Sequence, residues 1–405
     1  MKHSSIIFAV ALILGLFVVG SSAYALSPET ELLLQLLEKK GVVTQDEADA
    51  LRKEVEAAGS AADKETMKAE IKEEVTEELK AEGGILSGIQ EHISLSGLIE
   101  VEASFGDDFE DNDLSDIVLA TVELGIDAEI NDWVKGHLLL LYEEDETEPI
   151  DVDEGTITIG NPEVCPGYVT AGKMYVPFGN FETHMISDPL TLELGETNES
   201  AIQVGVETSG FYASVYAFNG DVDEHDNDDD EIEGFGVNAG FAYENDSVSL
   251  DLGVYYINNI GDSDLLTEFL PDEIDDYVEG YGVHGIFNIG PFSLIGEYME
   301  SGDEFEVGEL AFGSDGAEPA AWNVEAGYTF ELAGKETTLA IGYQGTDEAL
   351  ALELPETRLM GSVAMEIFDS TSLAFEWTHD EDYDESDGGT GEDTDIATIQ
   401  LGVEF

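Results

Sequence analysis

The stretch VLATVELGIDAEI, residues 118–130, alternates between two kinds of side chain. Its even positions are apolar throughout, from Val118 to Ile130, and its odd positions include Glu123, Asp127 and Glu129. A period of two predicts a β-strand with one apolar face and one acidic or glycine face. The same alternation returns in residues 235–244 and 322–330 and continues from about residue 92 to the C-terminus.

The connections between these segments decide between a soluble sandwich and a membrane barrel, because alternation alone fits both. Tight turns alternate with long acidic loops, and aromatic residues crowd beside the tight turns, as in outer-membrane barrels. The predicted turns are Asn131-Asp132, Ser209-Gly210, Asn245-Asp246, Gly290-Pro291, Ala333-Gly334 and Asp369-Ser370. The last strand ends in Phe405, which is typical of barrels inserted into the outer membrane. We therefore predict an all-β, transmembrane antiparallel barrel of about sixteen strands, spanning residues 90–405.

The N-terminal part of the chain has a different pattern. Residues 1–25 combine an apolar run with Ala23-Tyr24-Ala25, which predicts a cleaved signal peptide and export from the cytoplasm. Residues 26–84 are rich in Leu, Ala, Glu and Lys with helical spacing. We expect a short α-helical or coiled-coil segment in the periplasm, packed on its own neighbour or on another chain.

Charge and cysteine content restrict the function. The chain has 13 Lys and Arg against 92 Asp and Glu, a net charge of -79, and a hydrophobic content of 42% that a disordered acidic chain would lack. Such a charge repels nucleic acid and attracts cations. One cysteine, Cys165, permits neither an intramolecular disulfide nor a cysteine metal cluster. We expect no cofactor and no resident metal, although the acidic run 221–231 could either hold Ca²⁺ or be simply solvated.

A pore needs no catalytic residues, because its diameter and its charged rings set what passes. Only Lys135, Lys173, Lys335 and Arg358 are basic in the barrel region, so the predicted pore is anionic. The loop from Pro177 to about residue 198 bends at Pro-Phe-Gly, and we expect it to fold inward rather than over the mouth. The candidate pore-lining or constriction residues are Lys173, Glu182, His184, Asp188, Glu193, Glu196, Glu199, Glu123, Asp127 and Glu207. Further inward acids on the walls are Glu100, Glu102, Glu129, Asp251, Glu325 and Glu376.

Three segments resemble the LbtU family, which comprises siderophore porins with a helical N-terminal segment. They are ELLLQLLEKKGVVT at 31–44, ISLSGLIE at 93–100, and the bend at 177–179 followed by ETNESA at 196–201. The resemblance spans nearly the whole mature chain. It implies a plug-free outer-membrane receptor or channel for an iron siderophore, and it supplies no site residue.

The function we predict is an outer-membrane porin that passes small solutes through an acidic aqueous pore, with uptake of an iron siderophore as an extension. The alternative is a structural envelope protein that tethers the outer membrane to the cell wall. An enzyme is not expected, since no nucleophile with a nearby base stands out. The expected partners are outer-membrane lipid and lipopolysaccharide, the barrel-insertion machinery, small solutes or a ferric siderophore, and a second copy of the chain.

Overall fold

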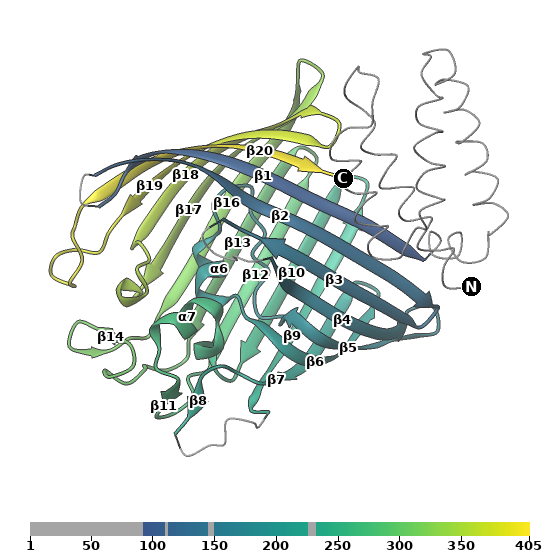
Figure 1. The fold of residues 1–405 in the computed structure, drawn as a ribbon, viewed down its shortest axis with the longest axis horizontal. Helices are drawn as coiled ribbons and strands as arrows, with labels where there is room; N and C mark the ends of the chain where they lie inside the picture. Colours follow the sequence, from purple (N-terminus) through teal and green to yellow (C-terminus); the bar gives the residue numbers. More distant parts are fainter. Residues whose placement is uncertain (1–91, 110–111, 145–149, 226–231) are drawn as a thin grey trace, which may run out of the picture. The chain divides into compact units, whose positions relative to one another are not determined.

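The computed structural model describes residues 92–109, 112–144, 150–225 and 232–405. Within these residues, sixteen antiparallel strands form one closed barrel in which each strand pairs with the next barrel strand along the chain. The first strand, β1, pairs with the last, β20, and so closes the ring, blue beside yellow in Figure 1. This confirms the predicted fold class and strand number. The expected signal peptide and the helical segment 26–84 lie outside the described residues.

The bounds of the elements follow the predicted alternation closely. The barrel strands are β1 (Ile93–Asp107), β2 (Asp113–Asn131), β3 (Val134–Tyr142), β4 (Asp151–Asn161), β5 (Cys165–Tyr175), β6 (Asn198–Thr208), β7 (Phe211–Phe218), β9 (Gly234–Asn245), β10 (Val248–Ile257), β12 (Gly280–Ile289), β13 (Phe292–Ser301), β16 (Ala320–Leu332), β17 (Lys335–Asp347), β18 (Thr357–Phe368), β19 (Thr371–Glu381) and β20 (Asp393–Glu404). The connections contain β8 (Asp223–Glu224), β11 (Glu273–Ile274), β14 (Ala311–Phe312), β15 (Asp315–Gly316), the helices α6 (Leu190–Gly195) and α7 (Asp264–Phe269), and the 3₁₀ turns η1 (Ile260–Asp262) and η2 (Leu350–Leu352).

Every second connection is a tight turn, and six of these seven turns lie at or within one residue of a predicted turn; the seventh joins β4 to β5. Ser209 and Gly210 have φ angles of 53° and 88°, and Ala333 and Gly334 have 54° and 79°. Positive φ at both central positions is the type I′ geometry, whose twist matches that of the flanking strands. The other connections are longer and carry all the short helices and the small sheets.

The outer face of the barrel is apolar and the inner face is polar. On β16, Val324 is 55% exposed whereas its neighbour Glu325 is 1% exposed. The same contrast separates Phe375, at 44%, from Glu376, at 1%, on β19. Exposed apolar side chains on alternate positions of a closed barrel form the surface that a bilayer covers.

The helices are short: α6 and α7 have six residues each. Across the part of the chain that the structure describes, no helix combines the length and apolar character needed to pass through a bilayer.

An apolar core lies among the long connections, and the alternation did not predict it. Leu190 and Leu194 of α6, Leu266 of α7, Ile260 of η1 and Met299 of β13 are all 0% exposed and belong to one cluster. This core joins α6 to the connections that follow β10 and β13. Helix α6 and the chain around it are therefore held by packing as well as by hydrogen bonds.

Candidate pore constriction

The connection between β5 and β6, residues 176–197, is the segment expected to turn inward. We call it the constriction loop. It begins with a bend in which Gly179 has a φ of 113° and Phe181 a φ of 57°. The ring of Phe178 is 1% exposed and packs edge-on against Tyr255, with ring centroids 5.4 Å apart. The loop then runs through α6 and ends at β6.

Three buried glutamates on the inner side of the wall hold the first half of the loop. We call Glu297 of β13, Glu325 of β16 and Glu376 of β19 the carboxylate clamp. They are 6%, 1% and 1% exposed. Each accepts hydrogen bonds from loop residues more than a hundred positions away in the chain.

Glu297 receives the start of the loop. Its Oε1 accepts from the Asn180 amide at 2.8 Å, and its Oε2 accepts from the Phe181 amide at 3.1 Å. The Thr191 hydroxyl donates to Oε2 at 2.9 Å, and the Tyr255 hydroxyl donates to Oε1. Amide and hydroxyl donors on an ionised acceptor are the stronger class of protein hydrogen bond.

Glu325 receives the middle of the loop in the same way. It accepts from the Thr183 hydroxyl at 2.7 Å and from the His184 amide at 2.8 Å. The Asn323 side chain, two residues before Glu325 on β16, donates to it at 3.0 Å.

Glu376 and Gln344 hold the next stretch. Glu376 accepts from the Ile186 amide at 2.6 Å, and from the Ser187 amide at 3.2 Å and hydroxyl at 2.6 Å. Gln344 Oε1, on β17, accepts from the Leu190 amide at 2.9 Å. The loop therefore follows the inner wall across β13, β16, β17 and β19, which confirms its predicted inward path.

The predicted histidine of the loop is a hydrogen-bonded residue. His184 Nε2 lies 2.7 Å from Ser293 Oγ, and the Ser362 hydroxyl donates to the His184 carbonyl at 3.0 Å. Glu182 is exposed beside Asn180, and its amide contacts the Asn180 side chain at 3.4 Å. The structure thus uses His184 to position the loop. A role of Glu182 at the constriction stays a prediction.

The second half of the loop gathers carboxylates. Glu196, at the end of α6, faces the charges of Asp264, Asp188, Asp153 and Glu193. Burial, followed by these like charges, raises the pKa of Glu196 to about 8. Asp188, Glu193 and Glu196 were predicted together. Asp153 of β4 and Asp264 of α7 were not predicted as part of this group.

Two carboxyls of the connection after β10 also have raised pKa values. Burial raises the pKa of Asp262 to about 7, although the Val222 amide donates to it and opposes the rise. Burial also raises the pKa of Asp264. The Asn198 amide donates to its carboxylate at 3.1 Å, and this hydrogen bond and the positive charge of Lys173 both oppose the rise. Glu199 lies at the start of β6, on the same side as the buried Ala201.

The remaining predicted residues lie on the strands. Glu123 and Asp127 alternate with exposed Leu124 on β2, and Asp127 contacts His137 Nδ1 at 2.7 Å. Glu207 is exposed at the turn end of β6 and pairs with Tyr212 of β7 in the sheet register.

Lys173 contacts β4 beside the constriction loop. Its side chain is on the opposite side of β5 from Met174, which is part of the apolar core. Its ammonium lies 3.8 Å from Asp151 and donates to the Val152 carbonyl at 3.2 Å. Its positive charge also opposes the raised pKa of Asp264, so a place for Lys173 at the constriction stays a prediction.

Sequence reasoning chose Glu325 and Glu376 as wall acids that line the pore, and it missed Glu297 and Gln344. The inward side of Glu325 and Glu376 was right. However, both are covered by the constriction loop, so they position the loop rather than line the water-filled part. The alternation along the strand could have placed Glu297 on the inner side of the barrel. Its hydrogen-bond partners, which are distant in the chain, could not be predicted from the sequence.

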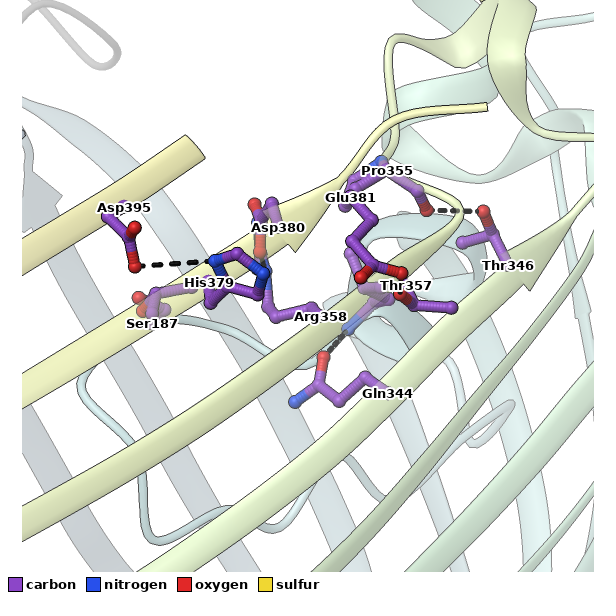
Figure 2. Close-up of polar contacts among 12 residues, drawn as sticks. Ser187, Gln344, Thr346, Pro355, Thr357, Arg358, His379, Asp380, Glu381 and Asp395 are labelled. Carbon is purple, nitrogen blue, oxygen red and sulfur yellow. Dashed lines mark hydrogen bonds and ion pairs between the residues drawn. The ribbon is translucent and has the colours of Figure 1, made fainter. Parts of the chain in front are cut away.

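One buried ion pair on the inner wall gives a stability prediction. Arg358 Nε and an Nη donate to the two oxygens of Asp380 at 2.9 and 3.0 Å, and both side chains are largely buried. Figure 2 shows them on adjacent strands. Arg358→Ala leaves Asp380 buried without its partner and should cost about 3–5 kcal/mol of stability. The loss should appear as a lower midpoint temperature in a heat-modifiability gel.

The matched control is Lys135→Ala. Its pair with Glu129 spans 3.7 Å, and both side chains are about two-thirds exposed, at 63% and 66%. That change should cost less than about 1 kcal/mol. Equal midpoints for the two variants would contradict the prediction.

The closed sixteen-strand barrel is similar in fold to solved outer-membrane channels and porins. The outer membrane channel DcaP of Acinetobacter baumannii has a TM-score of 0.54 to this chain at 15% identity, covering 77% of this chain and 97% of DcaP. OprB of Pseudomonas putida has a TM-score of 0.56 at 10% identity, covering 80% and 97%. These likenesses concern the fold.

The chain belongs to the UPF0422 family. A UPF0422 protein of Coxiella burnetii is 31% identical over 333 residues, which cover 79% of this chain and 71% of that protein. No family model matches the chain.

Proposed function

We propose that this protein is an outer-membrane porin that passes small cations and neutral solutes through a water-filled, acidic pore. The observation that carries the proposal is the pairing of an apolar outer face with a polar inner face in a closed barrel whose loop is fastened to the inner wall. An apolar exterior suits lipid, and a polar interior with a positioned loop suits a selective aqueous channel.

The charge of the inner side favours cations. Among residues 92–405 the basic side chains are Lys135, Lys173, Lys335 and Arg358. Three of them lie against carboxylates, and the fourth, Lys335, lies over the Phe368 ring at 5.8 Å. The pairing neutralises the few positive charges, whereas the acids near the constriction loop face one another. A lumen with this balance concentrates cations and excludes anions.

A planar-bilayer measurement tests the proposal. In a KCl gradient, the reversal potential should show K⁺ preferred over Cl⁻ by at least about tenfold at low salt, because a cleft of one charge sign concentrates counter-ions. The preference should fall as ionic strength rises, since salt screens the field. Anion preference, or no conductance from a folded and inserted protein, would overturn the proposal.

The resemblance to LbtU siderophore porins extends the proposal to ferric siderophores. The acidic lumen restricts that extension to complexes that are neutral or positively charged, because an anionic complex meets like charge. In the same bilayer, a cationic ferric siderophore should reduce the K⁺ current reversibly, and a carboxylate-rich one should leave it unchanged. The structural alternative, an envelope tether, predicts an inserted barrel without conductance.

The remaining expectations follow from this assignment. The described barrel would lie in the outer membrane, in contact with lipid and lipopolysaccharide. Residues 26–84 would form the periplasmic segment. Assembly with further copies of the chain is part of the same proposal.

A further inference from the structure

Three metal-binding side chains meet where β19 and β20 approach the connection 382–392. His379, Asp393 and Asp395 each offer one ligand atom, and these atoms all lie within 4.8 Å of one another. His379 Nδ1 is 3.3 Å from Asp395 Oδ1 and 4.0 Å from Asp393 Oδ2. Figure 2 shows the imidazole of His379 turned toward Asp395.

The strand register places these groups on the outer side of the barrel. His379 and Asp395 are direct partners across β19 and β20, and Asp393 is two residues before Asp395 on the same side. Trp377, which shares the side of His379, is 39% exposed. The cluster is therefore apart from the constriction loop and from the lumen, at the end of the barrel that carries the long connections.

The separations suit coordination of a single ion. Two ligand atoms bound to one ion at about 2.0–2.2 Å lie roughly 3–3.5 Å apart, and the His379–Asp395 distance falls in that range. Asp393 has a side chain 63% exposed and can rotate to close its longer distance. One imidazole nitrogen with two carboxylate oxygens favours divalent transition metals over Mg²⁺ or Ca²⁺, which prefer oxygen ligands alone.

A neighbouring indole orients two of the ligands. Trp377 Nε1 donates to Asp395 Oδ1 at 2.9 Å. The Trp377 ring also stacks on His379, with centroids 6.0 Å apart and planes 15° from parallel. Outer-shell groups that fix a ligand's orientation are a regular part of protein metal sites.

The other histidine–acid contacts in the described residues lack this arrangement. His137 meets one carboxylate, Asp127, and His284 meets one, Asp251. His225 meets Glu273 through Nδ1 and Asp275 through Nε2, so the two carboxylates lie against different nitrogens. Within the described part of the chain, His379, Asp393 and Asp395 are the one group of three that meets the 4.8 Å separation.

We propose that His379, Asp393 and Asp395 bind a divalent transition-metal ion, with Zn²⁺ as the probe, on the outer rim of the barrel. Such an ion would join β19 to β20 and offset the repulsion between the two aspartates. The remaining coordination positions would be filled by water. The site is independent of the proposed channel activity.

Calorimetric titration of the purified full-length protein in detergent tests the site. Excess Mg²⁺ should be present to occupy the many carboxylates that offer oxygen alone. The wild type should bind one Zn²⁺ more than His379→Ala, and His137→Ala should bind as the wild type does. Equal binding by the wild type and His379→Ala, or no Zn²⁺ binding by the wild type under Mg²⁺, would overturn the proposal.

Three further measurements separate ligation from a change in folding. Asp393→Asn alters an exposed side chain, and it should weaken Zn²⁺ binding at least about tenfold while the heat-modified gel shift stays intact. With Cu²⁺ as a second probe, electron paramagnetic resonance should show nitrogen coupling that disappears in His379→Ala. Trp377→Phe removes the positioning hydrogen bond and should weaken binding roughly tenfold. Nitrogen coupling that persists in His379→Ala would assign the metal elsewhere.

Discussion

Replacing Glu376 with alanine should release the middle of the constriction loop from the inner wall. The substitution removes the acceptor for the Ile186 amide and for the Ser187 amide and hydroxyl. Loss of these charge-assisted bonds should lower the free energy that holds the loop in place by about 3 kcal/mol. In hydrogen exchange, the amides of Ile186 and Ser187 should then exchange roughly a hundredfold faster.

The same release should change the current through single channels. A loop fastened at several points gives one steady conductance, whereas a loop free at its middle moves within the lumen and interrupts the current. We expect Glu376→Ala to show frequent transitions between conductance levels, and the Glu325→Ala/Glu376→Ala double variant to show more. Glu376→Gln keeps one carbonyl acceptor and should have a smaller effect.

Glu331→Ala is the matched control for the clamp. Glu331 lies on β16 on the same side as Glu325, but it is exposed and near the opposite end of the strand. Its removal changes the net charge by the same amount as removal of Glu376. Equal current noise in Glu331→Ala and Glu376→Ala would show that charge, and not the clamp, controls the loop.

Raising the pH through 8 should increase the preference of the pore for cations. Burial and the charges of Asp264, Asp188, Asp153 and Glu193 raise the pKa of Glu196 to about 8. Glu196 is therefore mostly protonated at neutral pH and gains its negative charge as the pH rises. Asp262, whose pKa burial raises to about 7, gains its charge in a nearby range, so the K⁺ preference, measured from about pH 6 to about pH 10, should rise and the rise should be smaller in Glu196→Gln than in the wild type.

The stability of the folded protein should fall as the pH rises. In the unfolded chain Glu196 ionises near its ordinary value of 4.5, so between 4.5 and 8 the folded state binds the extra proton. Stability contributed by the protonated form is therefore lost as the pH rises through this window. Above about pH 8, Glu196→Gln should unfold at a higher temperature than the wild type.

Glu182→Gln is the control for the pH prediction. Glu182 belongs to the same loop but is exposed at its other end. Its removal should leave the rise near pH 8 in place. A smaller rise in Glu182→Gln, or a rise in Glu196→Gln as large as that of the wild type, would contradict the assignment to Glu196.

The sequence by itself determined the barrel, its tight turns and the side on which each wall residue lies. A period of two is a local property, because successive side chains of a strand point to opposite faces. Glu325 and Glu376 could therefore be placed on the inner side without knowledge of any partner. The bounds of the constriction loop were also readable, since Pro177 and Gly179 interrupt the alternation where β5 ends.

Only the tertiary structure decided which inner acids are covered and which meet one another. Alternation reports the side of a strand and not the depth beneath a loop, so it could not distinguish Glu376, under the loop, from Glu123, on the wall. Glu297 reaches Asn180 across 117 positions of the chain, and Asp264 reaches Glu196 from a helix after β10. Such meetings depend on ring closure and on packing of the long connections, for which no short stretch of sequence carries a signal.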